Sequence, residues 1–547
     1  MSFLLRYGAI EFSNTVFDMQ QLSAIRGGSL AFLYSRNAVA DCLTRLLGAE
    51  KVTSVFAGAS QGAWVLEADR SEAQEALKQV EAALAQNSAD SGPHAHMAYT
   101  ASIVEITGTV EQALIRAEAL NAVQAQQFAR LPLPTFDPDT QKPDTLGDRK
   151  RPAHKKVKLG QMGEHDISDA HLARRRFGSQ QRQRFYRDFA RQVAEEEASG
   201  PDMGEAFTHD FASLVENPPP HWFDPKTGEK RPLPVSVRGK TAVFYADGNR
   251  FSRLFAAAQT AQDLGELSAY LRQQQGELLH GLLEWYRLGA QTTPHAFQFT
   301  GDDGNPRYRL ETLLFGGDEM LFVLPAWLAL GFVSEFYRLM DGWRFGEKRL
   351  SFSGGLVIAN ANTPIRQTKA LAEALAEENK ARFEGEGAAA ALESAEANGL
   401  QIEIFESLTV PDDDLAAYRQ RLYFSGAAAS DEQRAQLSHH LTIAGRDLPL
   451  LVERVEALLH SENSLPRSQL YRMLRDYTAM GGEAVRADLQ PSFNRWKKRA
   501  GAASPISFQQ LDLLHTSAEN PRTGLSLSQA AMLYDYTGKA AAASAHA

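Results

Sequence analysis

A short stretch near the middle of the chain, residues 314–325, constrains the fold more than any other feature of the sequence. It reads LFGGDEMLFVLP, so Gly316, Gly317, Asp318 and Glu319 interrupt residues that are otherwise apolar. The flanks LETLLF and EMLFVLPA have the Leu, Phe and Val content of strands, and the glycine pair predicts a β-hairpin turn between them. An ordinary acidic turn is one interpretation. Because the flanks belong in a covered sheet, the alternative is that the two carboxylates hold a cation.

A second acidic segment, KTAVFYADGNRFSRLF, lies upstream of the hairpin. The strand TAVFYA leads into Asp247 and Gly248, and a single amphipathic helix is expected from about Phe251 to Leu288. An acid followed by glycine and a helix start is typical of a nucleotide-phosphate site, because the first N–H groups of a helix can face phosphate oxygens. Hard cations take oxygen ligands from more than one segment. We therefore expect Asp247 to lie beside the hairpin, although an isolated Asp-Gly pair is often a simple turn.

The order of predicted elements is the same in two parts of the chain. From Thr241 onward it is β-α-β-β-α-β-α, the order of a ferredoxin-like palm, and the N-terminal part repeats it. When VFAGASQ is aligned with LFGGDEM, Ala59 and Ser60 take the places of the two acids. The sequence thus predicts an α+β chain with two ferredoxin-like palm domains, the first degenerate and the second catalytic.

Composition divides the chain into four expected ranges. They are a degenerate first palm (1–130), a basic, Pro-rich linker region (131–236), a catalytic palm (237–410) and a helical C-terminal domain whose low-complexity tail is expected to be disordered (411–547). In the linker, LARRRFGSQQRQRFYRDFARQ begins near Arg174 and interleaves Phe177, Phe185 and Tyr186 with basic residues. RNA binding is one interpretation of this pattern, and a solvated helix face is the other.

Charge and cysteine content exclude several classes of protein. The net charge of −10 argues against a nucleic-acid binder with one large basic face. The single Cys42 excludes an internal disulfide and a cysteine-rich zinc site. No apolar run is long enough to span a membrane and no signal peptide is evident, so we expect a cytoplasmic protein without a membrane partner.

Four segments, ADGNRF, FGGDEMLFVLP, SFSGGLVIAN and AEALAEENKAR, resemble the palm of GGDEF-type nucleotidyl cyclases in order and spacing. They resemble more closely the large polymerase-like subunit of type III CRISPR effector complexes, which has a GGDD hairpin running into LLP. The resemblance is firm over residues 240–405 and looser elsewhere. This sequence reads GGDE instead of GGDD, has no cysteine pairs between the palms, and starts directly with a palm-like region where that family often has an HD phosphohydrolase domain.

The resemblance implies a synthase that joins nucleoside triphosphates, ATP above all, into cyclic oligonucleotide messengers of antiviral defence. Two Mg²⁺ or Mn²⁺ ions would be bound by Asp247, the Gly248 carbonyl, Asp318 and Glu319, and Lys380 would neutralise triphosphate charge. The residues expected to contact nucleotide, besides Lys380, are Gly248, Asn249, Arg250, Phe251, Ser252, Gly316 and Gly317 and, in the first copy, Arg26, Gly27 and Gly28. For the last two glycines, close helix packing is the alternative.

The implied partners are nucleoside triphosphates and, through the family, RNA or other subunits of an RNA-guided effector complex. Two other functions stay open at this point. A cyclase of the diguanylate or mononucleotide type is disfavoured by the duplicated palm, because a diguanylate cyclase pairs identical active palms from separate chains. A non-catalytic RNA-binding or scaffold subunit is disfavoured by the intact acids Asp247, Asp318 and Glu319.

Overall fold

The computed structural model describes residues 1–128, 137–187, 207–381, 397–406, 414–423, 430–459, 468–472 and 531–538, apart from short gaps inside these ranges. Two compact units are present. The first comprises Met1–Glu205, Arg250–His280 and Thr312–Met320, and the second comprises Ala206–Asn249, Gly281–Glu311 and Leu321–Ala547. These units are discontinuous along the chain, whereas the four ranges expected from the sequence are continuous, and those four boundaries stay predictions. No described helix has the length and apolar composition needed to cross a bilayer.

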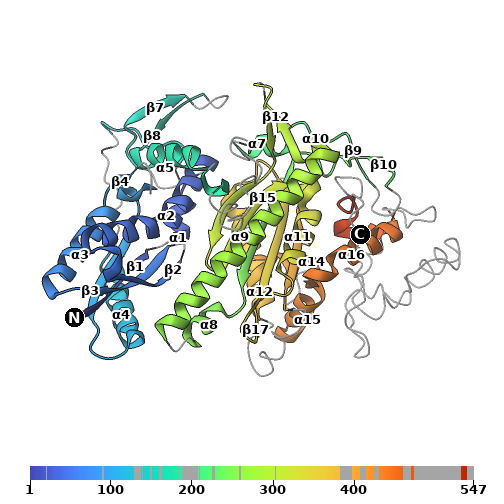
Figure 1. Cartoon of the computed structure of the whole chain (residues 1–547). Coiled ribbons are helices and arrows are strands. Elements are labelled where there is room, and N and C mark those ends of the chain that lie inside the picture. The colour runs from blue at the N-terminus through green and yellow to red at the C-terminus, as the bar shows by residue number, and fades with distance from the viewer. Residues whose placement is uncertain are drawn as a thin grey trace. The chain divides into compact units, whose positions relative to one another are not determined.

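The first unit is built on a four-stranded antiparallel sheet with the order β2-β3-β1-β6 (Figure 1). Its elements are β1 (Ser2–Ala9), α1 (Phe12–Val16), α2 (Leu22–Leu47), β2 (Val52–Ala57), β3 (Gln61–Glu67), α3 (Arg70–Leu84), β4 (Asn87–Ser88), β5 (Gly92–Pro93), β6 (Tyr99–Glu105), α4 (Val110–Phe128), β7 (Lys155–Lys158), β8 (Glu164–Ile167) and α5 (Asp169–Gln180). The main elements follow the predicted β-α-β-β-α-β-α order. The α+β class expected from the sequence is confirmed.

Different helices cover the two faces of this sheet. Phe3, Leu5 and Tyr7 of β1 share a core with α2 and α3, whereas Leu4 shares a core with α4. The alternation follows from strand geometry, because successive side chains point to opposite faces. Leu264 of α9 (Ala261–Thr292) joins the core on the α4 side. The N-terminal part of α9 is therefore packed as part of the first unit.

Helix α5 packs on α2 through two glycines. A Cβ atom at Gly27 would lie 1.9 Å from the carbonyl oxygen of Arg174, and Gly178 is equally tight against α2. The two backbones can approach this closely only because neither residue has a side chain. Arg26 is buried beside them and donates to the Gly178 carbonyl at 3.3 Å. Close packing, the alternative weighed for Gly27 and Gly28, is therefore present at Gly27, whereas a Cβ at Gly28 would have its nearest neighbour 3.5 Å away. A nucleotide contact at either glycine stays a prediction.

The basic segment around α5 is largely core. Arg174 is fully buried and pairs with Asp18 at 2.8 Å. Phe177, Phe185 and Tyr186 are at most 4% exposed. A buried ion pair cannot contact RNA, and buried rings cannot stack on bases. The RNA interpretation is therefore wrong for these residues, and the end of the basic run, from residue 188 onward, lies outside the described residues.

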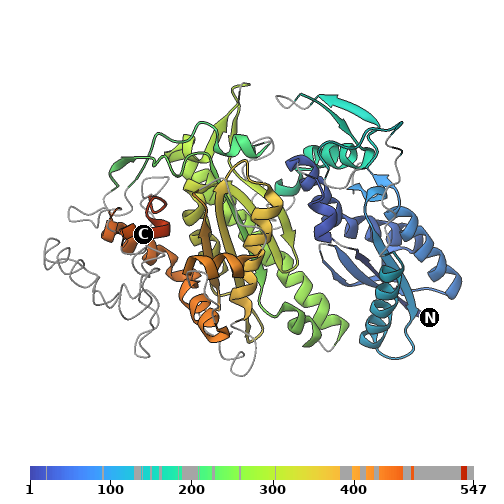
Figure 2. The same cartoon turned by 180° about the vertical axis from the view of Figure 1, so that it is seen from behind.

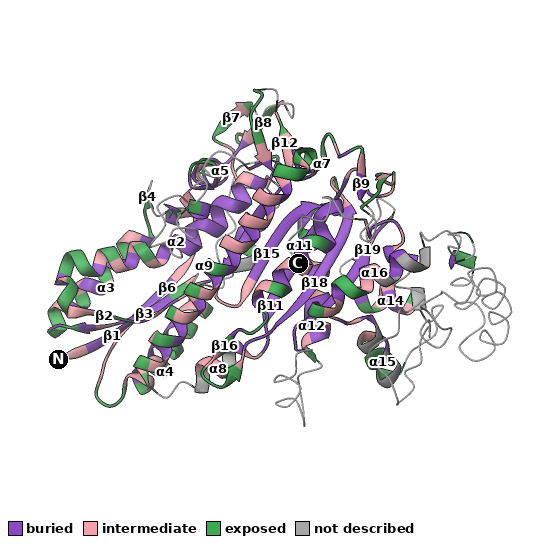
Figure 3. Cartoon of the chain, turned by 45° about the vertical axis from the view of Figure 1, so that its right-hand side comes forward, coloured by how far each residue is buried: buried purple, intermediate pink, exposed green. Residues whose placement is uncertain are grey.

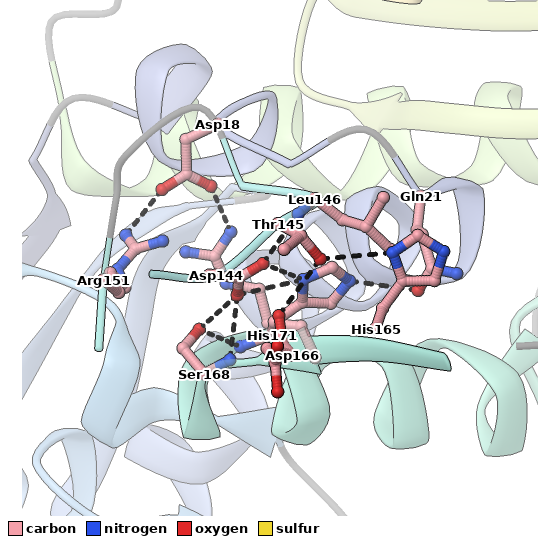
Figure 4. A network of polar contacts seen from close by, with 11 residues as sticks. Asp18, Gln21, Asp144, Thr145, Leu146, Arg151, His165, Asp166, Ser168 and His171 are labelled. Carbon is pink, nitrogen blue, oxygen red and sulfur yellow. Dashed lines mark hydrogen bonds and ion pairs between the residues drawn. The ribbon is translucent and has the colours of Figure 1, made fainter. Parts of the chain in front are cut away.

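A buried carboxylate, that of Asp144, joins the segment containing α5 to α2 (Figure 4). It accepts hydrogen bonds from the N–H and hydroxyl of Ser168 at 2.9 and 2.7 Å, and it lies 3.2 Å from His171 Nδ1. His171 Nε2 lies 3.0 Å from Gln21 Oε1. Burial alone would raise the pKa of Asp144, but the hydrogen bonds from His171 and Ser168 outweigh it and hold the pKa well below its usual range.

We expect Asp144 to make the stability of the first unit sensitive to acid. A carboxyl group with a depressed folded-state pKa stabilises the fold above its unfolded pKa of about 4, and this stability is lost as the pH falls toward the folded pKa. Asp144→Asn should lower the free energy of unfolding at about pH 7 and reduce the further loss between about pH 5 and pH 3. Urea unfolding measured across this range tests both effects, with the exposed Asp139→Asn as control. Equal acid sensitivity of the Asp144 variant and the unaltered chain would contradict the expectation.

Two adjacent glycines allow a sharp test of the contact between α2 and α5. Gly27→Ala should destabilise the chain by roughly 1–3 kcal/mol, because its Cβ overlaps a backbone carbonyl that cannot move cheaply. Gly28→Ala is the matched control, since the nearest atom to its Cβ, the Val16 Cα, lies 3.5 Å away. It should be neutral or stabilising by about 0.5–1 kcal/mol, because alanine favours a helix. Urea unfolding of both variants measures these changes in stability. Equal stability of the two variants would disprove the packing role of Gly27.

The second unit contains most of a larger mixed sheet with the order β14-β15-β11-β18-β19-β20. Its elements and those that connect them are β11 (Lys240–Gly248), α8 (Phe251–Ala257), α9, β14 (Glu311–Gly316), β15 (Glu319–Pro325), α11 (Ala326–Met340), β18 (Phe352–Asn360), α12 (Ile365–Lys380), β19 (Gly399–Ile404) and β20 (Ile443–Ala444). Strands β11 and β18 are antiparallel, and β18 and β19 are parallel. Of the first four strands in this order, β11 comes first in the chain, followed by β14, β15 and β18. The first sheet has the same arrangement, with β1 first in the chain and β2, β3 and β6 after it.

The helix expected from Phe251 to Leu288 is two helices, α8 and α9. Thr260 starts the second one with a reciprocal cap. Its hydroxyl accepts from the N–H of Asp263 at 3.1 Å, and the Asp263 carboxylate accepts from the N–H of Thr260 at 2.9 Å. A capping box satisfies backbone donors that only a helix start leaves open, so it fixes a new N-terminus.

Both faces of the large sheet are covered (Figures 1 and 2). Every residue of β11 is buried (Figure 3). On one face Phe244 packs on Phe336 of α11, with ring centroids 4.9 Å apart. On the other face α12 lies so close that a Cβ at Gly355 of β18 would be 2.0 Å from the Ala372 carbonyl oxygen. Any polar group on β11 or β18 therefore needs a partner within the protein.

The described part of the C-terminal region is mostly helical, as expected. It contains α14 (Leu415–Tyr423), α15 (Asp431–Leu441) and α16 (Leu448–Leu459). The shorter elements of the second unit are α7 (Phe211–Val215), β9 (His221–Phe223), β10 (Lys230–Pro232), α10 (Pro294–Phe297), β12 (Gln298–Thr300), β13 (Pro306–Tyr308), β16 (Arg344–Phe345) and β17 (Lys348–Arg349). The predicted low-complexity tail lies outside the described residues.

Candidate functional site

The end of β11 brings Asp247 against Lys380. The Asp247 side chain is 8% exposed and forms an ion pair through Oδ2 with the ammonium of Lys380, which is 23% exposed. The Tyr245 hydroxyl lies 3.5 Å from the same carboxylate oxygen. A carboxylate buried this far needs an opposite charge. Lys380, the last residue of α12, supplies it, and its expected role toward triphosphate stays a prediction.

Asn249, two residues after Asp247, is the centre of a buried hydrogen-bond network. Its Nδ2 donates to Ser351 Oγ at 3.0 Å and to the Ala397 carbonyl at 2.9 Å. Its Oδ1 accepts from Ser353 Oγ at 2.7 Å, and Asn379 donates to the same Ser353 oxygen at 2.8 Å. The network holds the end of β11, which carries Asp247, against the end of α12, which carries Lys380.

Three members of this network were not predicted as site residues, although the sequence contains a usable signal for each of them. Ser353 stands at the start of an otherwise apolar strand, Ser351 directly precedes that strand, and Asn379 directly precedes Lys380. A buried hydroxyl or amide almost always has a hydrogen-bond partner. The partner itself could not be read, because it depends on the cross-strand pairing of Asp247 with Ser353.

A sharp turn follows Asn249. Arg250 has a φ of 57°, in the left-handed region that residues other than glycine rarely adopt. Such a conformation costs about 1 kcal/mol or more and persists where the surroundings impose it. Helix α8 begins at Phe251, as predicted, and Phe251 is 1% exposed. The side chain of Ser252 lies outside the described part of the structure, and the nucleotide contacts of this turn stay predictions.

The Gly-Gly-Asp-Glu segment forms the predicted turn between β14 and β15. Gly316 and Gly317 have φ values of 150° and 66°, and at Gly317 a side chain would be strained. Asp318 and Glu319 are partly exposed. The Gly317 carbonyl accepts a hydrogen bond of 2.6 Å from Nε2 of Gln275 on α9. Gln275 is a positioning residue that no sequence signal indicates, because nothing local links α9 to the turn.

The corresponding turn of the first sheet joins β2 and β3. It is one residue longer, because β3 begins at Gln61, after Ser60, whereas β15 begins at Glu319 itself. Gly58 donates to the Gln61 carbonyl and Ala9 donates to the Ser60 carbonyl, both at 2.8 Å. Ala59 lies outside the described residues, and its sequence identity alone places a methyl group where the second copy has a carboxylate.

The groups that are expected to bind divalent cations have suitable donor atoms. The carboxylates of Asp247, Asp318 and Glu319 and the Gly248 carbonyl are the hard oxygen donors that Mg²⁺ and Mn²⁺ prefer. Asp318 and Glu319 are open enough to receive an ion from solvent. Within the described residues, however, no three His, Cys, Asp or Glu side chains gather into a ready metal-binding group. Asp247 is placed within the second unit and the two turn acids within the first.

We predict that the Asn249 network stabilises the second unit through its donors. Asn249→Asp keeps the shape of the side chain but turns an oxygen toward the Ala397 carbonyl, so two acceptors face each other. The loss should be about 1–3 kcal/mol in the free energy of unfolding. Denaturant unfolding measures it, with the partly exposed Asn360→Asp as control. A stability unchanged from that of the control variant would show that the network contributes little.

Comparison with known proteins identifies the central part of the chain. Residues 240–388 match the family model described as Cas10/Cmr2, second palm domain. No curated protein matches the chain. The match to the palm family begins with β11 and extends past the end of α12, so it includes both acidic segments and Lys380.

Several solved structures share the fold. The crystal structure of Csm1 in T. onnurineus has a TM-score of 0.53 and 11% identity, covering 98% of this chain and 70% of that one. A Csm1-Csm4 cassette in complex with cA3 has a TM-score of 0.51 and 12% identity, covering 98% and 69%. The same cassette in complex with one ATP has a TM-score of 0.50 and 12% identity, covering 98% and 70%. At such identities the likeness shows the fold alone.

Proposed function

We propose that this chain, whose residues 240–388 form a Cas10/Cmr2 second palm domain, is a metal-dependent nucleotidyltransferase that joins nucleoside triphosphates, ATP above all, into cyclic oligonucleotides. The observation that carries the proposal is the Asp247–Lys380 ion pair at the end of β11. Within the same family match, β11 is the sheet neighbour of β15, the strand that begins at Glu319 of the acidic turn. The cassettes solved with cA3 and with ATP support nucleotides as the ligand class.

In this proposal Asp247, Asp318 and Glu319 hold two Mg²⁺ or Mn²⁺ ions. When bound, such ions activate a 3′-hydroxyl and stabilise the leaving pyrophosphate. The chain's own contribution is positioning and charge. Gln275 holds the turn through Gly317, and the Asn249 network holds the strand end, so little reorganisation is needed when substrate binds. Lys380 carries a positive charge to the place where triphosphate charge would gather.

The first unit serves in this proposal as a degenerate palm that holds a second nucleotide without metal. The repeated strand order of the two sheets supports this. The turn between β2 and β3 has Gly58 and Ser60 where the second copy has its glycine and acid. The nucleotide that offers its 3′-hydroxyl does not need its triphosphate activated, so it does not need metal.

We further propose that the chain acts in the cytoplasm, in antiviral defence, with other subunits of an RNA-guided effector complex. Relatives in fold were solved together with Csm4, which supports a protein partner. Any RNA contact must use residues other than the buried Arg174, Phe177, Phe185 and Tyr186.

The proposal predicts that Asp318→Asn combined with Glu319→Gln reduces nucleotide linkage more than about 100-fold, because both changes remove the charge that holds the ions. The purified chain is incubated with each nucleoside triphosphate and Mg²⁺ or Mn²⁺, and the products are identified by mass spectrometry. Since both acids are partly exposed in a turn, the melting temperature should not change. The matched control is Glu347→Gln, an exposed acid that also follows a glycine in a turn, between β16 and β17.

The outcomes separate the functions. Cyclic oligoadenylate from ATP, lost in the double variant and kept in the control, supports the proposal. A cyclic dinucleotide made only from GTP would instead identify a diguanylate-type cyclase. Unchanged synthesis by the double variant would disprove the assignment of the two acids.

A further inference from the structure

A short segment late in the chain, residues 531–538, is packed into the second unit. Residues 473–530, which precede it, lie outside the described part of the structure. The segment reads AMLYDYTG, and the side chains of Leu533, Tyr536 and Thr537 are at most 2% exposed. Figure 1 shows it in red beside α16, which it contacts through Thr537. The segment is therefore held by residues that come much earlier in the chain.

Tyr536 is the centre of these contacts. Its hydroxyl accepts a hydrogen bond from the ammonium of Lys240 at 2.8 Å, and it lies 3.1 Å from a carboxylate oxygen of Glu406 and 3.2 Å from the Ser236 carbonyl oxygen. The same ammonium lies 5.5 Å from the centroid of the tyrosine ring. Burial raises the pKa of Tyr536 far above its usual range, so the hydroxyl keeps its proton and can donate it. Lys240, the buried first residue of β11, thus has a partner from the far end of the chain.

The two polar residues that flank this tyrosine are also paired with the second unit. Asp535 accepts a hydrogen bond from the Ser236 hydroxyl at 2.5 Å. The Thr537 hydroxyl donates to the carboxylate of Glu456 on α16, whose side chain is 3% exposed. The other oxygen of that carboxylate pairs with Arg231 of β10 at 2.6 Å. Because a buried acid has lost its hydration, it needs such partners, and the segment supplies one of them.

Shape limits the last position of the segment. Gly538 lies so close to Trp222 that a Cβ atom there would be 2.2 Å from the indole ring, and Trp222 itself is 4% exposed. At the other end, the Leu533 side chain is fully buried. The pattern Leu-x-Asp-Tyr-Thr-Gly, residues 533–538, is thus held through an apolar side chain, three hydrogen-bonding side chains and a glycine.

Contacts of this kind are typical of peptide recognition, in which a few anchor side chains, often aromatic, carry most of the binding energy. The residues that hold the segment, which we call the docking surface, all belong to the second unit and are Trp222, Ser236, Lys240, Glu406 and Glu456. The member nearest in sequence, Glu456, precedes Thr537 by 81 positions. The docking surface and the segment are therefore separate stretches of chain that meet through side chains.

We propose that the docking surface is a recognition site for a short peptide with the pattern Leu-x-Asp-Tyr-Thr-Gly, and that residues 531–538 are its tethered ligand within the same chain. Binding braces the start of β11, because Lys240 stands there. Asp247 stands near the opposite end of the same strand. The inference concerns peptide binding alone, so it does not depend on the proposed nucleotide chemistry.

Hydrogen exchange in the unaltered full chain provides the first test. A tethered ligand can dissociate without unfolding its receptor, so the amides of residues 531–538 should exchange through a local opening. This opening should appear at a lower urea concentration than the exchange of β11 and β18, as measured by mass spectrometry. A segment that exchanges only together with β11 would be an integral part of the core, and the proposal would be wrong.

Peptide binding provides the second test. A fluorescent peptide AMLYDYTG is titrated into the full-length chain in which Leu533→Asp and Tyr536→Ala disable the segment. It should bind this variant at least about tenfold more tightly than the unaltered chain, whose own segment is held at a high effective concentration. The same peptide with Tyr536→Ala should bind at least about tenfold more weakly, because it lacks the anchor ring and hydroxyl. Equal binding of both peptides and of a scrambled control would overturn the proposal.

Thermal unfolding and a milder variant guard against loss of the fold. The peptide should raise the melting temperature of the disabled variant but not that of the unaltered chain, because only a vacant site gains a ligand. Thr537→Val removes only the hydroxyl that faces Glu456. It should speed exchange of residues 531–538 and leave that of β11 unchanged, whereas the exposed control Thr53→Val should alter neither. Unchanged exchange of the segment in Thr537→Val would count against the proposal.

Sedimentation distinguishes a segment bound within its own chain from one exchanged between two copies. A monomer, or a dimer that persists in the disabled variant, agrees with binding within the chain. A concentration-dependent dimer that is lost in the disabled variant would show that the segment binds a second copy, which would overturn the assignment to the same chain.

Discussion

A carboxylate at the end of a strand buried on both faces must be balanced by positive charge, and much of the second unit serves this one requirement. Strand β11 is covered by α11 on one side and by α12 on the other, so Asp247 cannot rely on water. Helix α12 supplies the positive charge, because its last residue is Lys380. Helix α12 can lie this close to the sheet because residue Gly355 has no side chain, and a side chain there would overlap the Ala372 carbonyl. The fold thus buries an acid at a position where it needs a positive charge beside it. Such a position is suited to binding a metal ion.

The two sheets share a strand order but differ in the charge of their corresponding turns. Asp247 lies near the end of β11 and Glu319 begins β15, whereas the turn between β2 and β3 has Ser60 at the position that corresponds to Glu319. A palm that loses its acids loses its metal, and with it the means of neutralising phosphate.

The basic segment shows that charge composition does not locate a surface. Arg174 lies in a run of three arginines, yet it is buried against Asp18, while α5 packs on α2 through Gly27 and Gly178. Burying a guanidinium is tolerated only with a partner in good geometry. Asp18 is more than 150 positions earlier in the chain, as the separation of 156 shows, so no local pattern could have revealed the pair.

The sequence by itself determined the features that depend on near neighbours. Alternating and continuous apolar runs gave the strands, and the glycine pair gave the turn that presents Asp318 and Glu319. The same local signals gave the repeated element order, the α+β class and the position of Asp247 at a strand end. The cap at Thr260 was readable in the same way, and its omission merged α8 with α9.

Only the tertiary structure decided which distant residues meet. It paired Asp247 with Lys380 and placed Asn249 against the Ser353 hydroxyl of β18. These contacts depend on sheet register and on the closeness of helix packing. Side-chain identity along the chain determines neither quantity, because both arise from how all the buried faces fit together.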